Sequence, residues 1–388
     1  MLTIGGRLLI VLLLCFFASS TLAGGKDGVL HVTAENPSGF SRPNEIVEVP
    51  RSHLAAVIGT AVSPSLEVID ALGGGPLIAQ LTERGLLFQA SFAPHERKTF
   101  VVTLSTGPAP AVASLVDGRF VPPREDYAWE NDRIAFRTYG PALAAEVNNG
   151  IDVWTKRVRS LIVRKWYKES EAAPPGKDTY HQDRGEGADF FETGRSLGAG
   201  GSGLWIDGAL RQPGVFVAQR TLMNGPLRVS FELMYRWVLG SQDTVREYKI
   251  ITLDAGQNLN KIDVRFEGGQ LRDSLTLACG LVKREKTKLT QDPARRWIAL
   301  WGLTNADTAN GYLGTGIVFS DGTFDEFTQD AAQYLVLRRV PFHGSFTYYA
   351  GAGWTRSGDF SSEADWVTCL DTAAKRLREP LSLRYTDH

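Results

Sequence analysis

The chain has 388 residues, of which 43% are hydrophobic and 22% are charged, with 40 glycines and only three cysteines. This composition is that of a globular protein, and it excludes a collagen, a coiled coil and a small disulfide-stapled domain. The 42 basic and 43 acidic residues give a formal net charge of -1. Because no overall electrostatic field favours a polyanion, we expect no nucleic-acid partner.

Residues 1–23 have the order of a secretory signal peptide. A basic residue precedes an apolar run over residues 8–18, which is shorter than the roughly 20 residues that span a bilayer. We therefore expect cleavage after Ala23 and an exported protein, periplasmic or secreted, without membrane association after cleavage. Cys279 and Cys369 remain, both in apolar sequence, where buried free thiols are the commoner state although an exported protein could also pair them.

Residues 24–106 are predicted to form a small N-terminal β-sandwich. Four short runs of β-type sequence fall in this segment, at residues 29–33, 45–49, 86–90 and 99–104. Alternation of apolar and polar residues, with turn residues between the runs, is typical of such a sandwich. Proline and glycine punctuate residues 107–110, which we interpret as a linker.

Residues 111–388 are predicted to form a larger domain that is also mainly β. Its clearest strands are expected at residues 133–139, 227–235, 244–253 and 259–266. Short turns join several of these runs, which favours antiparallel meanders over crossover helices. We expect an irregular insert at residues 169–180 and one helix near the C-terminus, beginning at Ser361 and stopped by Pro380.

The first candidate site lies between residues 180 and 191, where an imidazole and three carboxylates fall within nine positions. His181 could act as a general base, and Glu186 with Asp189 could form an acid/base pair. Asp183, Glu186 and Asp189 could also hold a divalent cation such as calcium through oxygen ligands. The competing interpretation is a β-hairpin with solvated acids.

The second candidate site is the strand predicted at residues 133–139. Strict alternation places Arg133, Arg137 and Tyr139 on one face, beside Trp129. Two guanidinium groups on one face suit the recognition of a carboxylate, although a solvated face with ion pairs is an equal alternative. Trp166 lies between lysines, an arrangement that in an exported chain of near-zero charge favours a glycan over nucleic acid.

The third candidate segment, residues 342–354, again combines histidine and tyrosine with glycines. His343, Tyr349 and Trp354 could form the wall of a site. A buried aromatic β segment with a hydrogen-bonded histidine explains the same pattern equally well.

These three segments together resemble the exported bacterial family described as domain of unknown function 4861, which is met among polysaccharide-utilisation proteins. The matching text comprises residues 129–141, 150–154, 165–167, 180–190 and 351–354. Residues 253–260 are in addition similar to strands of the galactose-mutarotase-like β-supersandwich, which many uronate-polysaccharide lyases share. The resemblance implies this supersandwich for the main domain and a carbohydrate substrate, but no settled activity.

Our first functional hypothesis is an exported carbohydrate-active enzyme that cleaves an acidic, uronic-acid-containing polysaccharide or oligosaccharide by β-elimination. This reaction needs groups that neutralise the carboxylate, a base for the C5 proton and an acid for the leaving oxygen. The expected roles are neutralisation by Arg133 and Arg137, base chemistry by His181, and acid chemistry by Tyr139 or Tyr349.

Four alternatives remain open at the level of sequence. A glycoside hydrolase would use Glu186 with Asp183 or Asp189 as paired carboxylates. A mutarotase or epimerase would use His181 with a carboxylate, a glycan-binding protein would use the tryptophans and arginines without catalysis, and a structural protein would use none of them. A single shared site requires that His181, Glu186, Arg137 and Tyr349 meet in one cleft.

Overall fold

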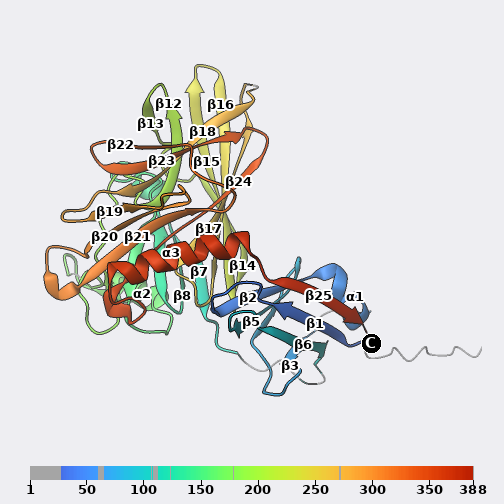
Figure 1. Cartoon of the computed structure of the whole chain (residues 1–388). Coiled ribbons are helices and arrows are strands. Elements are labelled where there is room, and N and C mark those ends of the chain that lie inside the picture. Colours follow the sequence, from blue (N-terminus) through green and yellow to red (C-terminus); the bar gives the residue numbers. More distant parts are fainter. Residues whose placement is uncertain are drawn as a thin grey trace, which may run out of the picture.

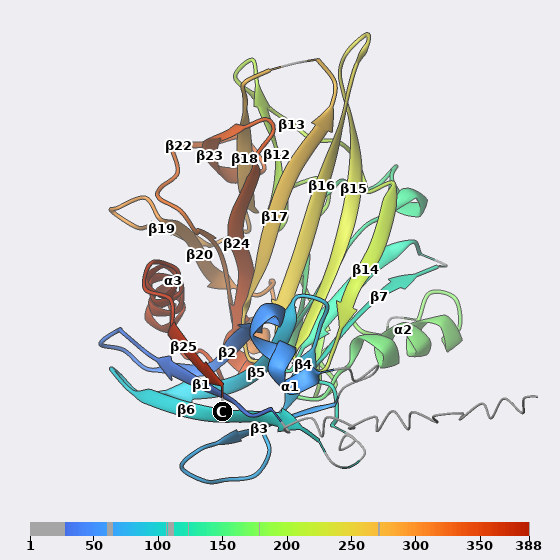
Figure 2. The same cartoon turned by 90° about the vertical axis from the view of Figure 1, so that its right-hand side faces the viewer.

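A computed structural model describes residues 28–59, 65–105, 107, 112–122, 124–177, 179–270 and 272–387. The signal peptide predicted at residues 1–23 and most of the predicted linker lie outside the described residues. Within them the chain is mainly β and its sheets are antiparallel, as predicted. A small sandwich lies beneath a larger unit built from three sheets (Figure 1; Figure 2).

The small sandwich has a four-stranded sheet in the order β25-β1-β6-β3 and a three-stranded sheet in the order β2-β5-β4. These strands are β1 (Leu30–Glu35), β2 (Arg42–Pro50), β3 (Leu66–Asp70), β4 (Ala79–Leu81), β5 (Gly85–Phe92), β6 (Arg97–Leu104) and β25 (Ser382–Asp387). A short helix, α1 (Ala55–Ile58), adjoins them. Val32, Phe88 and Phe100 are among the side chains buried between the two sheets.

The last strand of the chain corrects the predicted division into residues 24–106 and 111–388. β25 pairs with β1 along its whole length, from Leu30 opposite Asp387 to Glu35 opposite Ser382. The C-terminus therefore returns to the N-terminal sandwich (Figure 1). Sequence alternation identifies a strand but carries no information about its partner, so this long-range pairing was not foreseen.

The larger unit contains an eight-stranded sheet and two five-stranded sheets that pack on one of its faces. The large sheet, in spatial order, is β14 (Ala218–Asn224), β15 (Arg228–Gly240), β16 (Asp243–Asp254), β17 (Leu259–Gly268), β24 (Ser345–Trp354), β21 (Tyr312–Phe319), β20 (Trp297–Leu303) and β19 (Lys288–Gln291). One small sheet is β11 (Gly187–Asp189), β10 (Asp152–Lys156), β9 (Ile134–Thr138), β8 (Asp126–Asn131) and β7 (Val116–Val121). The other is β13 (Ala209–Arg211), β12 (Ala199–Ile206), β18 (Ser274–Val282), β23 (Gln333–Pro341) and β22 (Glu326–Gln329).

Alternation along β15 explains how the large sheet presents one apolar and one polar face. Val229 and Phe231 are fully buried in the core shared with the smaller sheets. Arg228 and Ser230 point to the opposite face, where β16 places Thr252 directly across from Ser230. The apolar face holds the sheets together, so the polar face remains available for a site.

Two helices cover the larger unit. The predicted C-terminal helix is confirmed as α3 (Glu363–Arg378), which begins at a capping box formed by Ser362 and Asp365 and packs on β20 and β21. The close packing of α3 on β21 depends on Gly314 of β21, because a Cβ atom at this position would lie 2.6 Å from the Trp366 ring. The predicted irregular insert at 169–180 is partly wrong, since α2 (Val163–Ala172) occupies its first residues.

Candidate functional site: a groove between the two units

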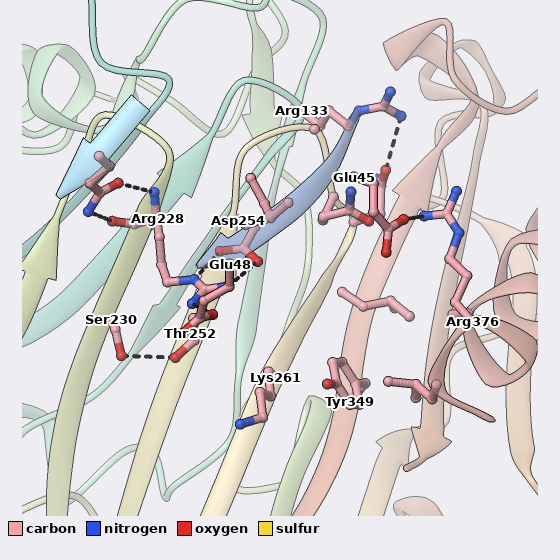
Figure 3. A pocket seen from close by; sticks show the side chains of 18 of the residues that line it. Glu45, Glu48, Arg133, Arg228, Ser230, Thr252, Asp254, Lys261, Tyr349 and Arg376 are labelled. Carbon is pink, nitrogen blue, oxygen red and sulfur yellow. Dashed lines mark hydrogen bonds and ion pairs between the residues drawn. The ribbon is translucent and has the colours of Figure 1, made fainter. Parts of the chain in front are cut away.

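A groove of about 1670 Å³ lies where the small sandwich, the polar face of the large sheet and α3 meet. The sandwich contributes β2 and the turn between β4 and β5, and the sheet contributes β14 to β17 with β24. Figure 3 shows that the labelled charged and hydroxyl side chains from these elements lie around one space. A concave surface on which a few polar groups converge is the usual form of a ligand site.

Cross-strand pairs build the floor of the groove. Arg228 lies opposite Asp254 and Ser230 opposite Thr252 on β15 and β16. β17 then places Lys261 beside Thr252, and β24 places Tyr349 beside Lys261. The Ser230 and Thr252 hydroxyl oxygens are 2.8 Å apart. Strand register alone thus aligns a row of polar groups across four strands.

Arg228 connects the floor to the small sandwich. Its Nε and Nη2 donate to the two carboxylate oxygens of Asp254 at 2.6 and 2.9 Å, and Nη1 donates to Glu48 of β2 at 2.8 Å. Burial opposes the charged form, but the two carboxylates outweigh burial and raise the pKa of Arg228. Each nitrogen of the guanidinium is therefore already engaged by a carboxylate of the protein.

Tyr349 differs from Arg228 because its hydroxyl group forms no hydrogen bond with the described residues. The side chain is half-buried in the groove, between Lys261 and the α3 wall (Figure 3). Burial raises the pKa of Tyr349 to about 12, and the negative charges of Asp263 and Asp254 contribute in the same direction. Lys261 Nζ donates to Asp263 at 2.9 Å. The groove therefore presents a protonated phenol beside an ammonium–carboxylate pair.

The predicted cluster around Arg137 forms a second polar group, outside the residues that line the groove. Arg137 Nη2 donates to Asp152 at 2.6 Å and to Asp189 at 3.0 Å. Burial and the nearby Asp152 raise the pKa of Asp189 well above its usual value, while burial raises the pKa of Asp126 to about 6. The Arg137 guanidinium also lies over the ring of Tyr139, a side chain that is only 5% exposed.

The three carboxylates predicted as calcium ligands have separate cationic neighbours. Glu186 accepts from Lys165 at 2.8 Å, Asp183 accepts from Arg157 at 3.1 Å, and Asp189 accepts from Arg137. Among the residues that the structure describes, no group of three or more His, Cys, Asp or Glu side chains could hold a metal ion. The expected calcium ligands therefore do not converge.

His181 lies at the edge of the Arg137 cluster. Its side chain is 56% exposed, and Nδ1 lies 3.0 Å from the backbone oxygen of Asp189. It does not line the groove that contains Tyr349. The single cleft expected for His181, Glu186, Arg137 and Tyr349 is therefore wrong.

The tryptophans predicted to stack on sugars are buried. Trp129 and Trp354 fill the core between the sheets, with exposures of 0% and 1%, and Trp166 is buried on the inner face of α2. Their indole N–H groups already donate within the protein, as from Trp129 to Asn260 at 2.7 Å. Buried rings present no face to a ligand, so this part of the prediction is wrong. His343 is exposed in the turn before β24, away from the groove.

A further motif in the sequence also proves structural. Residues 194–198 read Gly-Arg-Ser-Leu-Gly, the pattern of a nucleophile elbow in serine hydrolases. Ser196 is only 6% exposed, and its hydroxyl donates to the Thr193 carbonyl at 2.7 Å and accepts from the Gly198 N–H at 3.0 Å. This hydroxyl closes a turn and is not presented as a nucleophile.

Of the predicted site residues, Arg133 and Tyr349 are the ones that line the groove. The sequence analysis missed Glu48, Arg228 and Arg376. A signal for Arg228 existed, because the alternation of β15 already placed it on the polar face. Glu48 could not be found in this way, since it reaches the groove only through the docking of the small sandwich.

The fold and the groove define a two-unit, mainly β protein with a polar groove between its units. The family model described as "Domain of unknown function (DUF4861)" matches residues 34–383, so the chain belongs to this family, as the resemblance implied. The chain is also 29% identical over 402 residues to "Uncharacterized protein P7" of Formosa agariphila, with coverage of 96% of this chain and 98% of that protein.

Two solved structures share the fold. They are an alpha-mannosidase from Enterococcus faecalis V583 and a protein in the glycosyl hydrolase family 38 from Enterococcus faecalis, each with a TM-score of 0.53, 11% identity and coverage of 92% of this chain. The chain spans about half the length of these structures, 46% and 47%. Across the residues that the structure describes, no helix is long and apolar enough to cross a membrane.

Proposed function

We propose that the protein is an exported carbohydrate-active enzyme that binds an acidic glycan in the groove and cleaves it by β-elimination. The observation that carries this proposal is the Tyr349 hydroxyl, which is half-buried, protonated at neutral pH and without a hydrogen-bond partner among the described residues. A fold shared with part of an alpha-mannosidase is compatible with a carbohydrate substrate but does not specify the reaction.

The proposed reaction assigns one group to each proton. Asp263, whose charge acts on Tyr349, accepts the C5 proton of the uronic acid. The C5–H electron pair forms the C4=C5 double bond as the C4–O bond breaks, and Tyr349 donates its proton to the leaving oxygen. Neutralisation of the uronate carboxylate by a groove cation makes the C5 proton acidic enough to be removed.

The groove is less suited to a glycoside hydrolase. That chemistry needs a pair of carboxyl groups, one of which must donate a proton from an environment that favours its neutral form. Asp254 and Glu48 instead accept charge-assisted hydrogen bonds from Arg228, and Asp263 accepts one from Lys261. Tyr349 is the uncharged proton donor that this arrangement leaves free.

The proposal is tested by incubating the full chain with a panel of uronic-acid polysaccharides and measuring ultraviolet absorbance together with reducing ends. A lyase raises both, because each cleavage leaves an unsaturated uronide. Tyr349→Phe is expected to lower the rate by about 10²- to 10⁴-fold, the usual contribution of a positioned acid. His181→Ala is the control and is expected to change the rate less than about twofold, since His181 lies outside the groove.

Each other result points to a different function. Reducing ends without absorbance would identify a hydrolase, and binding of a polysaccharide without either product would identify a glycan-binding protein. Loss of activity in His181→Ala but not in Tyr349→Phe would move the chemistry to the Arg137 cluster.

A further inference from the structure

We propose that Arg133 and Arg376 form an oxyanion subsite at the end of the groove where α3 meets β2, and that this subsite binds the acidic substituent of the glycan. The inference rests on the proposed function, since it names the part of the substrate that this corner recognises. The observation behind it is that the protein uses little of the hydrogen-bonding capacity of the two guanidinium groups.

Arg376 lies in the last turn of α3 and reaches the groove with a side chain that is 19% exposed. Its contact with an acid is a long ion pair, 3.5 Å from Nη1 to Glu45 Oε2. No hydrogen bond joins its guanidinium to any described residue, and Nε is buried without a partner. An arginine carries five N–H donors, so this side chain is left with almost all of its donors unused.

Arg133 approaches the same corner from the turn before β9. Its Nη1 lies 3.3 Å from Asp359 and 3.5 Å from the Asn258 side-chain oxygen, and its Nε is also buried without a partner. Asp359 is already bound by Arg159, which donates to its two oxygens at 2.7 and 2.9 Å. Arg133 therefore shares a carboxylate that another guanidinium holds more closely.

The two cations lie at one end of the groove and both act on Cys369. Burial raises the pKa of the Cys369 thiol to about 11, and the positive charges of Arg376 and Arg133 both act against that rise. Figure 3 shows the guanidinium groups of Arg133 and Arg376 at the same end of the groove, near Glu45. Asp365, the acid that α3 contributes to the lining, is engaged with Ser361 and Ser362 at the helix cap.

Glu45 forms only long ion pairs at this corner. Its Oε1 lies 3.5 Å from Arg42 and its Oε2 lies 3.5 Å from Arg376, and Oε2 forms no hydrogen bond. Both distances are longer than the 2.7–2.9 Å of a good charge-assisted bond. A carboxylate or sulfate that enters between the guanidinium groups could form such short charge-assisted bonds, which Glu45 does not form.

The position of the subsite relative to Tyr349 suits the orientation of a bound glycan. Figure 3 shows Tyr349 between Lys261 on one side and Arg376 with Glu45 on the other. An acidic sugar held by Arg376 would thus extend its chain toward the Tyr349 hydroxyl. The subsite therefore both selects an acidic glycan and orients it.

The test is calorimetric binding to Tyr349→Phe, which allows binding to be measured without turnover. The probes are a galacturonic-acid tetrasaccharide, its carboxyl-reduced counterpart and a sulfated neutral tetrasaccharide. Adding Arg376→Gln is expected to weaken binding of an acidic probe at least tenfold and that of the reduced probe less than twofold. Arg378→Gln is the matched control, because it removes the same charge from the same helix at an exposed position outside the groove.

Several results would overturn the subsite: equal affinity with and without Arg376→Gln, an equal loss in Arg378→Gln, or no binding of any probe. Arg133→Gln should reproduce the tenfold loss, and unchanged thermal unfolding of both variants would show that the effect is not misfolding. A loss confined to the sulfated probe would keep the oxyanion subsite but assign it to a sulfate ester. If instead the subsite binds as expected and the wild type releases no unsaturated product, the lyase proposal fails and the subsite stands.

Discussion

Glu48 of the small sandwich lies 2.8 Å from Arg228 of the large sheet, so an ion pair joins the two units inside the groove. A buried amide reinforces this junction, because Gln80 Oε1 accepts from the backbone N–H groups of Leu227 and Arg228, each at 2.8 Å. The small sandwich is therefore part of the groove wall. The shape of the groove depends on how these few polar contacts hold the sandwich in place.

We predict that Gln80→Ala lowers the free energy of unfolding by about 1–3 kcal/mol, because it leaves two backbone N–H groups without an acceptor. Glu48→Gln is expected to cost only about 0–1 kcal/mol, since the Glu48 side chain is 43% exposed and water screens the pair. Urea denaturation of both variants measures the two values. A cost for Gln80→Ala no larger than that for Glu48→Gln would contradict this view of the junction.

Glu130 and Lys156 form a fully buried pair beneath α2. Lys156 Nζ donates to Glu130 at 2.7 Å, and Glu130 also accepts from the backbone N–H groups of Ile162 and Val163 at the start of α2. We predict that Glu130→Gln lowers the free energy of unfolding by about 3–5 kcal/mol, because it leaves the Lys156 charge buried without its partner.

The control for this prediction is Glu169→Gln on the exposed side of α2. Glu169 is 50% exposed and pairs with Lys165 at 3.8 Å, so its loss should cost about 0.5 kcal/mol or less. Equal costs for the two variants, measured by urea denaturation, would show that Glu130 does not anchor the helix.

Local sequence patterns predicted the elements of this fold far better than their partners. The alternation in β15 and the capped, amphipathic α3 depend on neighbouring residues, and both were found. The pairing of β25 with β1 joins residues more than 340 positions apart, and no local pattern encodes it. Gly351, which lies within the third candidate segment, is a packing residue in β24.

The candidate site was predicted only in part for a related reason. Trp129 has the residue type of a sugar platform, but residue type does not reveal burial, and the ring fills the core. Arg133 and Arg137 were expected together on one face, yet Arg133 contacts Asp359 while Arg137 contacts Asp152. Arg133 precedes β9 and therefore does not follow the alternation of that strand.

Asp126 provides a test of pH dependence. Burial raises its pKa to about 6, above the ordinary value of 3.8, so the folded state holds a proton that the unfolded carboxyl group releases. The contribution of this group to the free energy of unfolding is fully present below a pH of about 4 and is lost as the pH rises through about 6. We predict that, between pH 4 and pH 8, the wild type loses about 2–3 kcal/mol more of its free energy of unfolding than Asp126→Asn does.

The measurement is urea denaturation at both pH values. Asparagine still accepts the hydrogen bond that Tyr167 donates to Asp126 at 3.0 Å, so the variant changes the titration more than the packing. Asp321→Asn, at an exposed position, is the control and should follow the wild type. The prediction is wrong if Asp126→Asn shows the same pH dependence as the wild type.

Gly351 lies two residues after Tyr349, where β24 approaches the segment before β17 so closely that only glycine fits. A Cβ atom at this position would lie 2.0 Å from the Asn258 carbonyl oxygen and 2.9 Å from the Leu259 Cα. Both are backbone atoms that cannot move without displacing the strand that carries Lys261. We predict that Gly351→Ala lowers the free energy of unfolding by about 3 kcal/mol and also reduces glycan binding, because Tyr349 and Lys261 shift together. Gly75→Ala is the control, since a Cβ atom there meets nothing within 4 Å. If thermal unfolding and binding are unchanged in Gly351→Ala, the close approach of these strands does not position the groove floor.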